Sequence, residues 1–172
     1  VYCRLTNTFS SVSISAQMQS RLDRIEALIN EGHTLEKKWG YYPDLKSSSG
    51  KSVNIFGPLF RFSGPAGFSW IAFFFPWVVC AQIREWSYFY FVCAVSLFAT
   101  AANIAFDTSS GITFLTSFCY ANMFPYLRYL AKKRDVQEIS KGSSILIGFS
   151  LGGLALVPSF ILAAVSAVFV LY

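Results

Sequence analysis

The second half of the chain contains a run of 29 residues, 144–172, without a single charged side chain. As a straight helix this run is about 44 Å long, which exceeds the roughly 30 Å hydrocarbon core of a bilayer. The composition agrees with a membrane environment. Charged residues make up 13% and aromatic residues 18% of the 172 residues, whereas soluble domains carry about 25% charged residues. We therefore predict an all-α membrane protein.

Three further apolar segments precede this run. Residues 87–106 and 112–130 are 20 and 19 residues long, and each is long enough to span a bilayer as a helix. Residues 70–83 are only 14 residues with Pro76 in the middle, and a helix of about 21 Å is too short to cross. The predicted fold has about three transmembrane helices, one short re-entrant or interfacial aromatic helix, and a polar N-terminal helical region.

The charges divide the chain into two parts. Residues 1–66 hold 13 of the 23 charged side chains, so we predict a polar region at 1–66 and a membrane domain at 67–172. The stretch 41–50, rich in Pro, Ser, Gly and Asp, predicts a turn and linker.

Apolar residues at helical spacing within the polar part predict an amphipathic helix over about 15–31. Ser13 or Ser15 is suited to cap its first turn, and Gly32 to end it. The narrow apolar stripe either folds back on its own domain or the membrane surface, or binds a partner chain. Its members are Met18, Leu22, Ile25, Leu28 and Ile29.

Counting basic residues predicts the topology. If 70–83 does not cross, all 14 Lys and Arg residues lie on one side, and the turn at 107–111 contains Asp107 but no basic residue. Cytoplasmic loops are enriched in Lys and Arg, so the N-terminus is expected in the cytoplasm and the C-terminus outside. Arg84 and Glu85 are expected to pair at the headgroup level. The predicted interface anchors are Trp70, Trp77, Arg84, Trp86, Lys132, Lys133 and Arg134.

Polar and small residues within the apolar segments are candidates for helix packing. An Asn in hydrocarbon needs partners for its amide, which hydrogen bonds between helices can supply. Asn103 and Asn122, the latter flanked by Tyr126, are therefore predicted at helix contacts, with a ligand or pigment contact as the alternative. Gly148 and Gly152 form a Gly-x-x-x-Gly pair, which permits close approach either to a helix of the same chain or to another subunit.

Few residues are available for familiar catalytic or metal chemistry. His33 is the single histidine, and the four cysteines, at positions 3, 80, 93 and 119, form no CxxC pair. No nucleotide-binding, zinc-protease or serine-hydrolase motif occurs. We predict no catalytic residues, no metal site and no cofactor, and leave a bound lipid or pigment open. Basic residues interleave with acidic ones and form no recognition motif, so nucleic acid is not an expected partner.

The aromatic stretch around 68–77 and the segment around 120–130 have a parallel in known sequences. The first contains Phe-Ser-Trp-Ile-Ala-Phe-Phe-Phe-Pro-Trp, and the second contains Tyr-Ala-Asn-Met-Phe-Pro-Tyr-Leu-Arg-Tyr-Leu before basic residues. From Phe68 to Arg134 the chain resembles small bacterial inner-membrane proteins grouped as domain of unknown function 2628. Phe75 and Pro125 depart from that family's pattern. The resemblance implies a bacterial inner (cytoplasmic) membrane protein and brings no activity with it.

Three function classes follow from these features. We favour a non-enzymatic accessory or scaffold subunit of a larger membrane protein complex, whose partners are membrane lipids and other membrane subunits or further copies of the chain. The alternatives are a small transporter or channel component, which would use the helices broken at Pro125 and Pro158, and a lipid-modifying membrane enzyme. The net charge of +5 also favours contact with anionic lipid headgroups.

Overall fold

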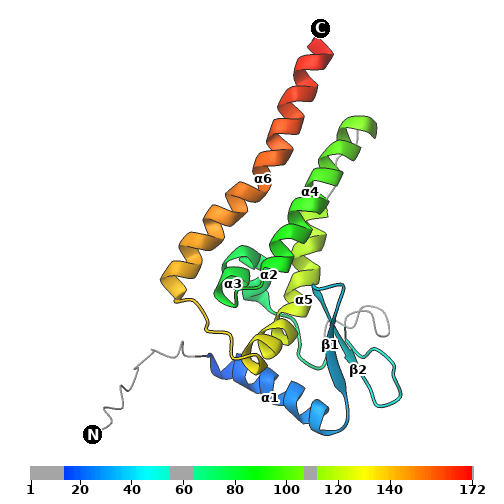
Figure 1. Cartoon of the computed structure of the whole chain (residues 1–172), viewed down its shortest axis with the longest axis vertical. Coiled ribbons are helices and arrows are strands. Elements are labelled where there is room, and N and C mark those ends of the chain that lie inside the picture. Colours follow the sequence, from blue (N-terminus) through cyan, green and yellow to red (C-terminus); the bar gives the residue numbers. More distant parts are fainter. Residues whose placement is uncertain (1–13, 55–63, 107–111, 172) are drawn as a thin grey trace, which may run out of the picture.

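The computed structural model describes residues 14–54, 64–106 and 112–171, and it is mostly helical (Figure 1). The helices α4 and α6 project from one end, while α1 and a β-hairpin lie at the other end (Figure 1). The helical class agrees with the prediction, but the sheet was not predicted. In chain order the elements are α1 (Ala16–Asn30), β1 (Thr34–Lys38), β2 (Tyr42–Lys46), α2 (Trp70–Phe74), α3 (Pro76–Gln82), α4 (Trp86–Phe106), α5 (Ile112–Lys133) and α6 (Lys141–Leu171).

Two helices of the described residues are long and apolar enough to cross a membrane, namely α4 and the Lys141–Val168 part of α6. Both were predicted as spans. Only 11% of the most apolar stretch of each helix is buried within the chain, unlike the core helix of a soluble protein. The helix α6 runs continuously through Pro158.

The third expected span, 112–130, forms the helix α5 but lacks the apolar character of the other two. Its second half is instead the centre of the protein core, because every residue from 120 to 130 is buried. Residues of α1 and β2 pack around it. Burial in protein and burial in lipid both select apolar residues, and here burial in protein accounts for the second half of the segment.

The helix α1 begins and ends as predicted. The Oγ of Ser15 accepts a hydrogen bond from the backbone N–H of Met18, and Gly32 follows the helix with a φ of 93°, a conformation that glycine adopts without strain. The buried residues Leu22 and Ile25 join a cluster with Tyr126 of α5. The amphipathic stripe is thus folded back on its own chain.

The predicted turn and linker at 41–50 is wrong over its first half. Residues Tyr42–Lys46 form β2, which pairs antiparallel with β1 and is almost entirely buried. The charged Asp44 made a buried strand hard to recognise in the sequence. In the structure Asp44 is 1% exposed, and its carboxylate pairs with Lys38 Nζ at 2.6 Å. The backbone N–H of Val53 extends the pairing, because it donates a hydrogen bond to the carbonyl of Leu45 at 2.7 Å.

The short aromatic segment 70–83 does not form a single helix. It breaks at Phe75 into α2 and α3, with Pro76 at the first position of α3, where its missing N–H leaves no helical hydrogen bond unmade. Neither piece is long enough to cross a bilayer. The segment lies between α5, which α2 contacts, and α6, which α3 contacts.

The Asp44 carboxyl makes the stability of the hairpin depend on pH. Burial raises the pKa of Asp44, but hydrogen bonds from Lys38 and Ser52 outweigh burial and hold the pKa below its ordinary value. Since the unfolded carboxyl titrates near 3.9, this group contributes stability above that pH and loses it as the pH falls through the folded pKa. The free energy of unfolding in detergent should therefore fall with acidification in the wild type and fall less in Asp44→Asn. The exposed Asp23→Asn should behave like the wild type.

Candidate functional site

A close helix contact joins α6 to α3. A Cβ added at Gly148 would lie 2.6 Å from Val78 Cα, and one added at Gly152 would lie 3.0 Å from the Trp77 ring. The Gly-x-x-x-Gly pair thus serves packing within the chain, which is one of the two predicted alternatives. Its partner is the short aromatic helix α3.

A groove opens beside this contact, with a volume of about 270 Å³. Its wall is almost wholly apolar or aromatic. Gly153 lies on its edge with nothing within 4 Å of an added Cβ. The residues that line it are Phe74, Phe75, Trp77, Val78, Val92, Ser96, Gly148, Phe149, Gly152, Gly153 and Leu156.

Small residues on α6 continue from this groove toward the C-terminal end. Gly153, Ala164 and Ala167 are separated by eleven and three residues, so they lie on one face of the helix. All three are exposed. On α4, Ala94, Ala101 and Ala105 are likewise exposed at helical spacing. Small residues in membrane helices are typical of close helix contacts, and in the described part of the chain these faces are uncovered.

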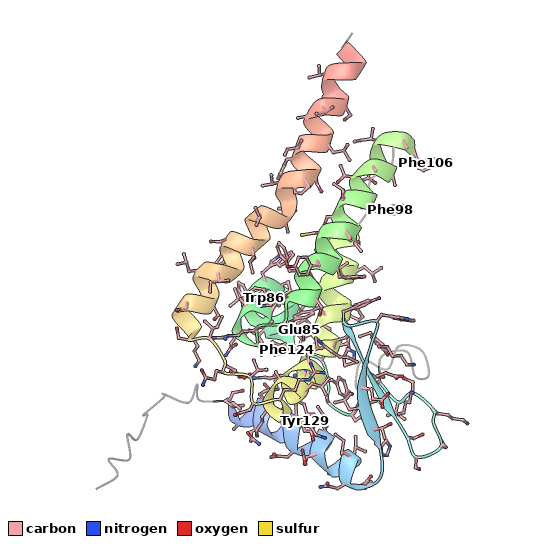
Figure 2. All side chains as sticks on the ribbon, in the orientation of Figure 1. Glu85, Trp86, Phe98, Phe106, Phe124 and Tyr129 are labelled. Atoms are coloured by element: carbon pink, nitrogen blue, oxygen red, sulfur yellow. The ribbon has the colours of Figure 1, made fainter. Side chains whose placement is uncertain are left out.

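Large apolar side chains surround these small residues. Phe98 of α4 is 73% exposed and Phe160 of α6 is 69% exposed. Figure 2 shows Phe98 and Phe106 on the part of α4 that projects away from the core. The surface of α4 and α6 therefore requires a covering of lipid or protein.

A polar cluster lies where α3 meets α4. Cys80 Sγ donates a hydrogen bond to the backbone carbonyl of Glu85 at 2.6 Å, and Tyr88 stacks on Tyr120 with ring centroids 3.9 Å apart. Burial, together with the charge of Glu85, raises the pKa of the Cys80 thiol to about 12. The thiol is therefore protonated at neutral pH, whereas the thiolate is the nucleophilic form. This cysteine is suited to packing.

The Glu85 carboxylate binds the hairpin to the start of α4. It pairs with Lys37 Nζ at 2.5 Å and accepts a hydrogen bond from the Ser87 hydroxyl. The expected pairing of Arg84 with Glu85 is thus wrong. Arg84 is exposed, with a φ of 53°, and Lys37 reaches the carboxylate from β1. Figure 2 places Glu85 next to Trp86 at this junction.

A second ion pair fixes the segment between α5 and α6. Arg128 Nε and Nη2 donate to the two carboxylate oxygens of Glu138 at 2.8 and 2.6 Å, and Gln82 Nε2 donates to Glu138 at 3.2 Å. The backbone N–H of Ile139 also donates to the carbonyl of Gln82 at 2.9 Å. Bidentate pairs of this kind are strong and directional, so the segment is held against α3.

Among the residues that the structure describes, Asn122 does not make the interhelical hydrogen bond that was expected. Its Nδ2 donates to the carbonyl of Phe118 in its own helix at 2.9 Å. The neighbouring Pro125 has the larger structural effect. A proline lacks the N–H that would bond the carbonyl four residues earlier, and that carbonyl, of Ala121, accepts instead from the backbone N–H of Ser69 at 3.1 Å.

The other predicted packing residues occupy different surroundings. Tyr126 is 2% exposed and its hydroxyl accepts from the backbone N–H of Ala66 at 3.4 Å, so it connects α5 to the segment before α2. Asn103 is half-buried on α4. The site residues do not converge on a single cavity.

The predicted interface anchors fall into two groups, those that are exposed and one that is packed inside the chain. Trp70 is 65% exposed, and Trp86, Arg84, Lys132, Lys133 and Arg134 are also exposed. Trp77 instead packs against Gly152 and the rings of Tyr88 and Phe89. An exposed tryptophan that the sequence reasoning missed is Trp39, in the turn between β1 and β2.

Among the residues that the structure describes, no group of three or more His, Cys, Asp or Glu side chains is placed to hold a metal ion. Comparison of the chain with protein-family models, with curated proteins and with solved structures finds no match. The resemblance of 68–134 to the bacterial membrane family therefore stays a prediction.

Proposed function

We propose that this chain is a non-enzymatic accessory or scaffold subunit that packs sideways against another membrane protein. The uncovered faces of α4 and α6 carry the proposal. Lipid alone would cover the exposed phenylalanines, but it gives no reason for the exposed small residues beside them. Gly153, Ala164 and Ala167 let a further helix approach α6 closely, and the groove at Gly153 is where such a helix would begin its contact.

The arrangement of the other elements supports one topology for this subunit. The start of α4, the second half of α5 and the segment before α6 pack on α3, α1 and the hairpin. If α4 and α6 cross a bilayer, the chain has to return between Phe106 and Tyr120, so the first half of α5 belongs to a third crossing. The C-terminal end of α6 then faces the side opposite α1.

The basic residues orient this arrangement. Every described Lys and Arg lies before α4, in the second half of α5, or between α5 and the first residue of α6. Because basic residues favour the cytoplasmic side, α1 and the hairpin belong in the cytoplasm. Together with the resemblance at 68–134, this supports placement in a bacterial inner membrane.

Gly153→Leu tests the proposed contact. A bulky side chain on the open edge of the groove should block a partner helix, while the fold of the chain itself stays intact. We expect a photo-crosslinking residue at Ala164 to give a discrete protein adduct in native membranes, and Gly153→Leu to reduce this adduct by about tenfold. Differently tagged copies of the chain distinguish self-association from a foreign partner.

The matched control for this experiment is the same crosslinker at Ala155, which is 1% exposed and should give no adduct with another protein. Adducts with lipid alone from Ala164, Ala101 and Phe160 would contradict the subunit proposal. In that case the groove and the uncovered faces are lipid contacts.

A further inference from the structure

Trp39 is an exposed aromatic residue in a strained backbone conformation. The residue is 81% exposed and its φ is 51°, in the left-handed region that is unfavourable for a residue with a Cβ. Gly40, the next residue, has a φ of 77° and adopts it freely. The Trp39 ring lies 6.4 and 6.5 Å from the rings of Tyr41 and Tyr42, but most of the residue is open to contact something outside the chain.

The turn that carries Trp39 lies against the first part of α4. Tyr41 stacks on Phe91 of α4 with ring centroids 4.8 Å apart, and the Trp39 and Tyr41 rings are 6.4 Å apart. The pairing of Lys37 with Glu85 holds the same end of the hairpin at the start of α4. Phe91 is five residues after Trp86, about 7.5 Å along the helix. The turn is therefore at the level where a membrane-spanning α4 leaves the polar region.

The helix α2 marks the same level by independent contacts. Phe73 of α2 packs edge-on against Phe114 of α5, with centroids 5.2 Å apart, and Trp70 and Phe74 of α2 are 65% and 63% exposed. Figure 1 shows α2 and the turn between the strands at similar heights, on different sides of α4 and α5. The elements that carry these exposed aromatic residues, α2 and the turn of the hairpin, thus lie near the start of α4.

We propose that the β1–β2 turn is a membrane anchor, with the Trp39 indole inserted at the headgroup level of the bilayer that α4 crosses. Tryptophan is enriched at this level because its ring is apolar and its N–H is polar. The turn residues 38–41 include no carboxylate that anionic headgroups of the cytoplasmic leaflet would repel. The anchor rests on the proposed spanning role of α4.

The test uses the full chain reconstituted in phosphatidylcholine and phosphatidylglycerol vesicles, with and without bromine on the upper acyl-chain carbons. Bromine quenches tryptophan fluorescence at short range, and the difference between wild type and Trp39→Phe isolates the Trp39 signal. We expect bromine to reduce this difference signal by about twofold or more if the ring lies at the interface. An unquenched difference signal would overturn the anchor.

The double variant Trp39→Phe, Thr34→Trp supplies the matched control. Thr34 is exposed at the far end of the same strand, about 17 Å from position 39, so its tryptophan should stay unquenched. The remaining tryptophans of Trp39→Phe separate the two proposals. If they are quenched while the Trp39 signal is not, the anchor alone is wrong. If no tryptophan is quenched, α4 is not in the bilayer, and both proposals are overturned.

Discussion

Glu138→Ala is expected to lower the free energy of unfolding by about 3 kcal/mol, the lower end of the range for breaking a buried ion pair. The Arg128 side chain is 9% exposed, and its two hydrogen bonds to Glu138 would be lost together. The guanidinium would then be left buried without its counter-charge. We choose the lower end because the Glu138 side chain is 19% exposed, so water can reach the vacated space.

Denaturant titration in mild detergent measures this loss. The double variant Arg128→Met, Glu138→Leu removes both charges and should recover most of the stability, since replacing a buried pair by apolar residues is often neutral. Glu31→Ala removes an exposed carboxylate and should change the free energy of unfolding by less than about 0.5 kcal/mol. A Glu138→Ala protein as stable as the Glu31→Ala protein would contradict the role given to the ion pair.

Gly148→Leu is expected to be of similar severity, at about 3 kcal/mol, the upper end of the usual cost of overpacking. The added Cβ would meet the Cα and N of Val78 at 2.6 and 2.7 Å. Backbone atoms cannot rotate away as a side chain can, so α6 must move off α3. Even Gly148→Ala should destabilise, although alanine favours a helix over glycine by about 0.8–1.0 kcal/mol.

Gly153→Ala is the matched control, five residues further along the same helix. Nothing lies within 4 Å of its added Cβ, so only the helix preference acts and the melting temperature in detergent should stay equal or rise. Opposite effects of the same substitution at 148 and 153 would show that close approach to α3, and not glycine content, is what α6 needs. Equal effects at both positions would contradict the packing.

The long helices were predictable from sequence because their composition has a single physical cause. The uncharged stretch in α6 and the apolar run of α4 have few environments open to them other than lipid. The boundaries of α1 were equally readable, since Ser15 satisfies a free N–H at its start and Gly32 adopts the conformation that ends it. Local chemistry was sufficient in these cases.

The hairpin could not be found in the same way. Its strand β2 contains Pro43 and Asp44, residues that favour turns. Once the chain is folded, Lys38, Ser52 and Asn54 supply partners for their polar groups. No pattern in the sequence predicts these contacts. Trp39 was not predicted as an interface residue for the same reason. The turn that contains it was not recognised, so the direction of its side chain could not be inferred.

The second half of α5 shows a different limit. Its residues were assigned to lipid, although they pack against α1 and the hairpin. Arg128 was the available signal, because a charged group within an apolar helix is costly without a partner. The nearest downstream glutamate, Glu138, is that partner. The contact of α6 with α3 could not be predicted from the glycine spacing either. That spacing indicates close approach but does not identify the helix that approaches.

In the proposed topology, α1, the hairpin and the segment before α6 lie on one side of a membrane that α4 crosses. Single cysteines at Lys132 and at Asp107, in a chain whose four native cysteines are replaced by alanine, test it with an impermeant maleimide on sealed vesicles. Lys132 is exposed at the end of α5, and Asp107, outside the described residues, directly follows α4. We expect the two positions to be labelled from opposite sides. Labelling of both from the same side would contradict it.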